Sequence, residues 1–215
     1  TGASGFLGNS VRPLLERTYD IVTVGLLPQD DYTINIAKEI PLLRERYDVV
    51  FHAAGKAHSI PKTEAEKQAF FDVNLQGTKN LCAALEKAGI PRAFIFVSTV
   101  AVYGCDYGEN ITEEHPLYGN TPYAMSKRLA EKYIQKWCCE HNVVLGIIRP
   151  SLIAGPTPPG NLGAMIHGIR NGKYLSIAGG QARKSVLMVQ DIAKLVPLLV
   201  EKGGIYNVCD SHHPT

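Results

Sequence analysis

The sequence of 215 residues predicts an α/β fold in which helices cover both faces of a parallel sheet. Short apolar runs alternate along the chain with longer stretches that carry helix caps. The run Asp48–Ala54 is almost wholly apolar, as expected of a strand that is buried on both faces. The chain also opens on Gly2, Gly5 and Gly8, a spacing typical of the tight turn between a strand and a helix.

The strands follow from short apolar runs that are bounded by turn residues. In chain order we expect them at Ile21–Val24, Tyr32–Ile36, Asp48–Ala54, Ala93–Ser98, Val143–Ile148 and Gly204–Asp210. Because Thr1 and Gly2 already belong to a turn, we expect the strand that should precede them to be absent. The chain is therefore expected to be trimmed at both ends.

Helices fill the gaps between these strands. The first, Gly5–Arg17, follows the glycine turn directly. The second, Thr63–Lys87, begins with a capping box in which Thr63 is followed three residues later by Glu66. A third begins at Pro122 and continues to His141, because Thr121 can cap it and no glycine or further proline interrupts it.

Composition excludes several classes of function. Lysines and arginines number 22 against 20 acids, so no basic surface indicates a nucleic acid or an anionic membrane as a partner. No apolar run is long enough to span a membrane. The five cysteines include the adjacent pair Cys138 and Cys139, which suits reduced thiols in a cytoplasmic protein better than a disulfide framework. His52 has no second ligand at metal-binding spacing, so we expect a hydrogen-bonded strand-end histidine.

The third helix carries the residue pair that most strongly indicates a chemical function. Tyr123 and Lys127 are four residues apart and share one helix face. Of the ten tyrosines, Tyr123 alone has a lysine four positions later. A neighbouring ammonium favours the phenolate, so we expect Lys127 to lower the pKa of Tyr123. The alternative is a surface helix on which both side chains merely cover apolar neighbours.

Several segments are expected to converge at one edge of the sheet. In parallel sheets ligands bind beyond the carboxyl ends of the strands. Four segments fall at such ends, namely 2–8, 53–56, 98–99 and 150–151. The glycines would let backbone N–H groups approach a pyrophosphate. The strand ending at Val24 is followed by Gly25 instead of the acid that usually binds the adenosine ribose, and no arginine follows, which leaves NAD and NADP open.

Six motifs follow one another along the chain, namely Thr1–Gly8, His52–Gly55, Asn74–Leu81, Phe96–Gly104, Tyr123–Lys127 and Arg149–Pro156. In these motifs and in their order, the chain resembles the extended short-chain dehydrogenases/reductases of the nucleotide-sugar epimerase/dehydratase group. The resemblance covers nearly the whole chain. It implies a Rossmann-type doubly wound sheet over residues 1–150 and a partial substrate-binding region over 151–215, interleaved with the last strands. It also implies a bound NAD, with NADP as the alternative, and a nucleotide-sugar substrate.

The resemblance also implies a role for individual residues. Tyr123 would be the catalytic acid/base, Lys127 its partner, and Thr99 the hydroxyl that binds the reacting sugar oxygen. The cofactor would contact Gly2, Gly5, Phe6, Leu7, Gly8, Ala53, Ala54, Gly55, Asn74, Tyr123, Lys127, Pro150 and Ser151. Asn35 and Ile36 would contact the adenine, although a turn asparagine explains Asn35 equally well. The substrate would contact Lys56, His58, Ser98, Thr99, Asn161, Leu162 and Arg183.

The absence of an acidic pair after Thr99 narrows the range of possible reactions. Relatives that are 4,6-dehydratases place an Asp-Glu pair directly after the catalytic threonine, whereas Val100 and Ala101 stand here. The remaining chemistry is hydride transfer at one sugar carbon, expected at C4, by an epimerase or by a 4-keto-sugar reductase. The loop 159–163 and Arg183 resemble enzymes that act on UDP-N-acetylhexosamines, while Leu152 departs from the asparagine of many galactose epimerases.

Two questions stay open at this stage. A protein of this fold that only senses NAD(P) is the alternative to an enzyme, and such proteins tend to lose the Tyr–Lys pair. The family often forms homodimers through the two helices that correspond to Thr63–Lys87 and Pro122–His141. Their apolar residues, such as Phe70 and Ile134, serve equally for packing on the sheet, so the oligomeric state is open.

Overall fold

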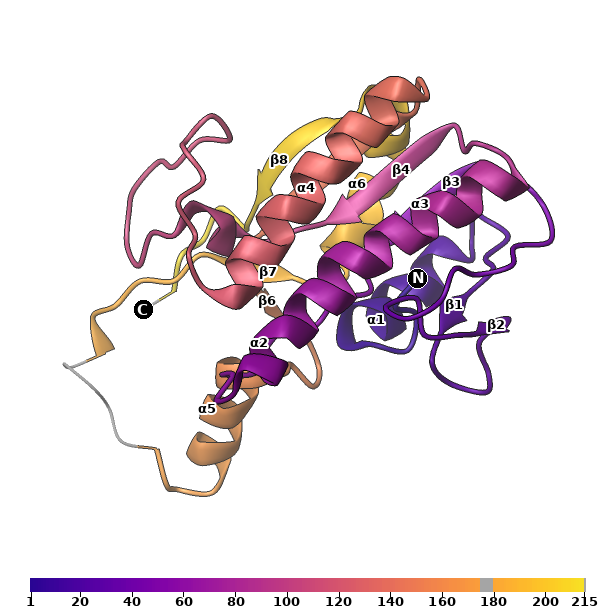
Figure 1. Ribbon diagram of the computed structural model, residues 1–215. Helices are drawn as coiled ribbons and strands as arrows, with labels where there is room; N and C mark the ends of the chain where they lie inside the picture. The colour runs from indigo at the N-terminus through magenta and orange to yellow at the C-terminus, as the bar shows by residue number, and fades with distance from the viewer. Residues whose placement is uncertain (175–179, 215) are drawn as a thin grey trace.

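The computed structural model describes residues 1–174 and 180–214 (Figure 1). Its centre is a four-stranded sheet in which every neighbouring pair is parallel. The strands, in their order across the sheet, are β3 (Val49–His52), β4 (Ala93–Val97), β5 (Val144–Pro150) and β8 (Gly204–Val208). All five residues of β4 are buried. In β3, for which burial on both faces was predicted, only Val50 and His52 are buried, and Val49 and Phe51 are partly exposed.

Helices form a layer on each face of this sheet. On one face, α1 (Phe6–Leu15) and α6 (Asp191–Lys202) pack against Ile95 and Val97 of β4. On the other face, α3 (Gly77–Ala88) and α4 (Pro122–Glu140) pack against Phe94 and Phe96. Successive residues of one strand point to opposite faces, so β4 supplies side chains to both cores. The predicted Rossmann-type arrangement is confirmed.

The sheet is less continuous than the sequence predicts. Two further pairs of parallel strands stand apart from the central sheet. They are β1 (Val24–Gly25) with β2 (Tyr32–Thr33), and β6 (Leu152–Ala154) with β7 (Val186–Met188). The predicted strand Ile21–Val24 is therefore reduced mainly to its last residue, and the sequence analysis did not anticipate β6 or β7.

A cavity of about 500 Å³ lies beside the shortened strand. It lies between the segment 21–24 and β3, and its lining includes Ile21, Val49, Phe51, Leu81 and Leu85. Thr1 also lines the cavity, and its backbone nitrogen donates to the Phe51 carbonyl at 2.8 Å.

The long helix predicted from the capping box is present, but a π-helical turn divides it into two α-helices. Thr63 Oγ1 accepts from the backbone N–H of Glu66 at 3.2 Å and caps α2 (Glu64–Phe71). Between α2 and α3 lies a π-helical turn, Asp72–Gln76, which holds Asn74. Isolated π-turns inside helices are frequent at functional sites. The sequence pattern does not reveal this turn.

The α4 helix begins as predicted, with the Thr121 hydroxyl accepting from the backbone N–H of Ala124 and with Pro122 in its first turn. A 3₁₀ turn, Val100–Tyr103, follows β4. The later helix α5 (Gly160–Arg170) buries none of its side chains. Within the described residues, no helix is both long and apolar enough to cross a membrane. The division of the chain at residue 150 stays a prediction.

Candidate active site

The glycine turn before α1 is shaped by close backbone approach. Gly2 has φ of +75°, and a Cβ atom there would lie 2.6 Å from the Ala54 nitrogen. A Cβ on Gly8 would lie 2.2 Å from the Gly2 carbonyl oxygen. Both positions therefore require glycine. A Cβ on Gly5 would meet the same carbonyl oxygen at 3.4 Å, an ordinary contact, so packing alone does not explain this glycine.

Gly5 instead leaves the start of α1 open. It is the exposed N-cap residue of this helix, and it supplies no side-chain hydrogen bond to the first turn. The first turn also holds no acidic residue. Unsatisfied N–H groups and the helix dipole make such a terminus suitable for a phosphate. The predicted contacts of Phe6, Leu7 and Gly8 with a cofactor concern this same turn.

The Thr99 and Tyr123 side chains meet at the carboxyl end of β4. Thr99 follows this strand and is 9% exposed, and its side chain lies close enough to the Tyr123 phenol to affect the pKa of Tyr123. The backbone N–H of Ala101 donates to Thr99 Oγ1 at 3.2 Å and fixes its position. Burial raises the pKa of Tyr123, and the interaction with the Thr99 side chain opposes that shift. A proton-transfer group and a hydroxyl partner are thus held together.

Lys127 follows Tyr123 by one helical turn on α4. Its ammonium donates to the Val97 carbonyl at 2.8 Å and lies 4.8 Å from the centroid of the Phe96 ring. Burial lowers its pKa to about 8, and the Glu131 carboxylate opposes that shift. The shift in the pKa of Tyr123 comes from burial and from Thr99, so the expected lowering of that pKa by Lys127 stays a prediction.

The Lys127 ammonium lies against Gly55, which belongs to the segment predicted to bind the cofactor. A Cβ on Gly55 would lie 3.1 Å from Lys127 Nζ and 3.1 Å from Asn74 Oδ1. Residues 53–55 therefore pass directly over the ammonium, and Gly55 itself is exposed. A group bound along the glycine-lined face at Gly55 would lie close to Lys127.

The Asn74 side chain hydrogen-bonds the backbone at the end of the same segment. Its Oδ1 accepts from the Lys56 N–H at 2.8 Å, while its Nδ2 donates to the Lys56 carbonyl at 3.1 Å and to Ser126 Oγ at 2.9 Å. Asn74 is fully buried, so its amide shapes the backbone beside the site. His52 is also buried and bonds Thr1 Oγ1 and Thr78 Oγ1, which confirms the interpretation as a hydrogen-bonded histidine.

Ser151 adds an unpaired polar atom at the end of β5. Its hydroxyl is the buried side-chain polar atom without a hydrogen-bond partner among the described residues. Such groups are costly and call for an explanation. A ligand that reaches the carboxyl ends of the strands would provide one. The exposed N-terminus of α1, the glycine cradle and the Ser151 hydroxyl together fit a dinucleotide.

The structure does not favour Asn35 and Ile36 as contacts of an adenine. Asn35 Oδ1 accepts from the backbone N–H of Ala37 at 3.0 Å, as in a turn asparagine. Ile36 is buried, and its side chain lies 3.3 Å from where a Cβ on Gly77 would be. Ile36 thus packs against the helix, which favours the structural interpretation of this pair.

The predicted substrate residues are only partly brought together. The Lys56 ammonium lies 5.4 Å from the centroid of the Phe70 ring. His58 has φ of 56°, and its Nδ1 lies 2.7 Å from where a Cβ on Gly160 would be, so it meets the first turn of α5 that carries Asn161 and Leu162. The Ser98 hydroxyl points inward to Glu131 instead of toward this group. Arg183 is exposed in the segment before β7, and its role stays a prediction.

Sequence reasoning missed Asp30. The carboxylate absent from the end of β1 is supplied from the following loop, because Asp30 Oδ2 lies 2.3 Å from where a Cβ on Gly25 would be. The same oxygen accepts from the backbone N–H of Leu27 at 2.9 Å. The Asp30 side chain is buried. An acid followed by a short strand, Tyr32–Thr33, was the available signal.

The described residues contain no group of three or more side chains suited to hold a metal ion. The elements present are those of a dinucleotide-dependent oxidoreductase site. Residues 1–209 match the model of the NAD dependent epimerase/dehydratase family, and the chain belongs to this family.

The similar proteins include an epimerase and a reductase. The chain is 36% identical to the N-acetyl-alpha-D-glucosaminyl-diphospho-ditrans,octacis-undecaprenol 4-epimerase of Escherichia coli O157:H7, over 66% of this chain and 44% of that protein. It is 27% identical to the GDP-6-deoxy-D-mannose reductase of Pseudomonas aeruginosa, over 97% of this chain and 73% of the relative. The chain thus spans less than half of the first relative.

A solved structure agrees in fold. RMD from Pseudomonas aeruginosa, complexed with NADPH, superimposes with a TM-score of 0.77 at 26% identity, covering 99% of this chain and 76% of the other. Enzymes of this family depend on NAD or NADP.

Proposed function

We propose that the protein is an NAD-dependent 4-epimerase that acts on a UDP-hexose or UDP-N-acetylhexosamine. The observation that carries the proposal is the placement of Thr99 beside the Tyr123 phenol at the carboxyl end of β4, with Lys127 one helical turn after Tyr123 and against Gly55. A phenol, a hydroxyl and an ammonium in this region suit proton transfer to and from a sugar oxygen. The 36% identity to a 4-epimerase supports 4-epimerisation as the reaction.

The residues would divide the work as follows. Tyr123 as phenolate removes the proton from the C4 hydroxyl, and Thr99 hydrogen-bonds the same oxygen and holds it in line. The bound nicotinamide supplies the hydride acceptor and donor. Lys127 lies under residues 53–55, where its charge would favour the phenolate once water is excluded. After the keto sugar has turned and has been reduced at C4 on its other face, Tyr123 would return the proton to the C4 oxygen, which gives the opposite epimer.

Elimination is not part of this proposal. Val100 and Ala101 follow Thr99 in the 3₁₀ turn, and neither can exchange protons at C5 and C6. A 4-keto-sugar reductase is the second candidate, supported by the similarity to the Pseudomonas aeruginosa reductase over nearly the whole chain. Such an enzyme would use the same groups for one half of the cycle and exchange its cofactor.

The test incubates the full-length protein with a panel of UDP-sugars and follows C4 configuration by NMR. Interconversion of a pair of C4 epimers without added cofactor, together with NAD released on denaturation, is the expected result. Consumption of added NADPH with a 4-keto sugar, and no epimer formation, would support the reductase instead. Absence of hydride exchange with every sugar nucleotide would overturn both.

The cofactor choice gives a further prediction at Asp30. Its carboxylate, packed on Gly25, would bind the ribose hydroxyls of NAD and repel the 2′-phosphate of NADP. Asp30→Asn keeps the hydrogen bond to the Leu27 N–H through the amide oxygen but removes the charge. We expect the ratio of NAD to NADP affinity to fall by about tenfold or more. Fluorescence titration with each cofactor measures the ratio, and an unchanged ratio would contradict this assignment.

A further inference from the structure

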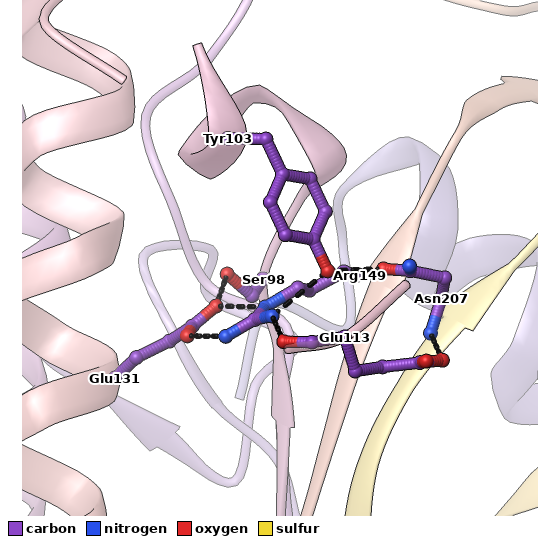
Figure 2. A network of polar contacts seen from close by, with 6 residues as sticks. All are labelled: Ser98, Tyr103, Glu113, Glu131, Arg149 and Asn207. Carbon is purple, nitrogen blue, oxygen red and sulfur yellow. Dashed lines mark hydrogen bonds and ion pairs between the residues drawn. The ribbon is translucent and has the colours of Figure 1, made fainter. Parts of the chain in front are cut away.

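A network of polar contacts joins Ser98, the residue before Thr99, to Tyr103, Glu113, Glu131, Arg149 and Asn207 (Figure 2). At its centre the Arg149 guanidinium makes two hydrogen bonds to the Glu131 carboxylate, Nη2 to Oε2 at 2.6 Å and Nε to Oε1 at 3.1 Å. The Ser98 hydroxyl donates to the same carboxylate. Glu131 is 0% exposed and Arg149 is 2% exposed. The pair therefore joins α4 to the ends of β4 and β5.

The far side of Arg149 reaches three more elements. Its Nη1 donates to the Tyr103 hydroxyl at 2.9 Å and to the Glu113 carbonyl at 3.1 Å. Tyr103 in turn donates to Asn207 Oδ1 at 2.7 Å, and Glu113 Oε1 accepts from the Asn207 backbone N–H at 2.6 Å. One guanidinium thus connects the 3₁₀ turn after Thr99, the loop before α4, and β8 (Figure 2).

Stability alone gives a weak reason for this arrangement. Taking two charges out of water costs free energy that their attraction offsets only when the geometry is good. A pair of apolar side chains of similar volume is often as stable or more stable. The placement of the pair is more informative. Glu131 lies one helical turn after Lys127 on α4, and Ser98 is the residue before Thr99.

We propose that Glu131 and Arg149 are a positioning pair that holds Thr99 and Lys127 in place relative to Tyr123. The proposal rests on the catalytic function proposed above. Through Ser98, the carboxylate fixes the backbone from which the Thr99 hydroxyl reaches the phenol. Through α4, the same carboxylate fixes the helix that carries both Tyr123 and Lys127. The catalytic groups come from two elements, and Glu131 contacts both.

The carboxylate also acts through its charge. The titratable groups around Lys127 are Glu131 on the next turn of α4, Tyr123 on the preceding turn, and His52 at the end of β3. Burial lowers the pKa of His52 well below its usual value, which leaves the imidazole neutral. Glu131 is therefore the negative charge that keeps the Lys127 ammonium protonated to about pH 8.

Kinetic variants separate positioning from stability. Glu131→Gln in the full-length protein is expected to lower kcat by about 100-fold, because small misplacements of catalytic groups have effects of this size, while KM changes by less than about threefold. The double replacement Glu131→Leu with Arg149→Met removes both charges and avoids a lone buried guanidinium. We expect it to keep the parent melting temperature and yet to show the same loss of kcat. Full activity in this double variant would overturn the proposal.

Two milder variants serve as a probe and a control. Ser98→Ala removes the hydrogen bond to Glu131 and leaves the ion pair intact, and we expect a kcat loss of about tenfold without a change in melting temperature. Glu140→Gln removes the charge of the exposed Lys136–Glu140 pair on the same helix, and we expect parent kinetics. Equal effects of Glu131→Gln and Glu140→Gln would contradict a specific role.

A titration that needs no sugar substrate tests the pair independently of the proposed function. NMR of lysine side chains, with the Lys127 signal assigned by its loss in Lys127→Arg, should show titration near pH 8 in the parent. In Glu131→Gln the titration should move to lower pH, because a group that favours the ammonium is gone. An unchanged titration would overturn the coupling even if the enzyme were active. A shifted titration in an inactive protein would leave the coupling standing while the proposed function fails.

Discussion

Tyr123→Phe is expected to lower kcat by about 10³-fold while leaving cofactor and nucleotide-sugar affinity within about threefold of the parent. The substitution removes one oxygen from a half-buried side chain, at the point where Thr99 affects the pKa of the phenol. The ring remains and keeps its contact with Phe70, at 6.2 Å between centroids. The loss therefore reports on proton transfer and not on packing. Steady-state kinetics and binding titrations on the same samples measure the two effects separately.

Tyr133→Phe on the same helix is the matched control. Its ring lies 5.7 Å from the Lys79 ammonium, away from Thr99, and we expect parent kinetics. Turnover of Tyr123→Phe within about fivefold of the parent would show that another group moves the proton. Loss of cofactor binding in Tyr123→Phe would show that the phenol is a binding group instead.

Gly8→Ala is expected to weaken both folding and cofactor binding. A Cβ there would lie 2.2 Å from the Gly2 carbonyl oxygen and 2.6 Å from Ala3 Cα, both of them backbone atoms. The turn or α1 must move, and strain of this kind typically costs about 1–3 kcal/mol. For a chain of this size, that corresponds to a melting temperature lower by roughly 5 °C. Cofactor affinity should fall with it, because the displaced turn forms the cradle.

Gly5→Ala separates the two effects. Its Cβ would make only an ordinary 3.4 Å contact, and the φ of −75° suits alanine. We expect the melting temperature to change by about 1 °C and the cofactor affinity to fall by about tenfold, since the methyl group occupies the approach to the first turn of α1. Thermal denaturation without ligand and cofactor titration distinguish the cases. Equal affinity in Gly5→Ala and the parent would contradict a phosphate site at this helix start.

The features that depend on neighbouring residues could be predicted from the sequence. The Thr63 and Thr121 caps mark the starts of α2 and α4, because each hydroxyl accepts from the backbone N–H three positions later. The central strands β3 and β4 follow from apolar runs. The convergence of the glycine turn, Gly55 and Thr99 at one edge is expected from parallel topology, and in the structure the glycine turn adjoins Ala53 and Ala54.

What depends on distant partners could not be predicted. The segment 21–24 is apolar, but whether it forms a strand depends on a neighbour across the cavity. The pKa of Tyr123 depends on its burial, which the spacing to Lys127 does not report. Glu131 and Arg149 are 18 positions apart, and no local pattern in the sequence pairs them. Arg149 at the end of the apolar strand β5 was the available signal.

The π-helical turn between α2 and α3 makes the number of residues in that segment matter more than their identity. Asp72–Gln76 contains one residue more than regular α-helical winding would accommodate. Each residue advances a helix by about 100°, so deleting any one of them would rotate α2 by that angle relative to α3. Phe70 would then leave the Tyr123 ring, and Asn74 would lose its grip on Lys56. Single-residue deletions in this segment should therefore be harsher than any substitution at its exposed positions.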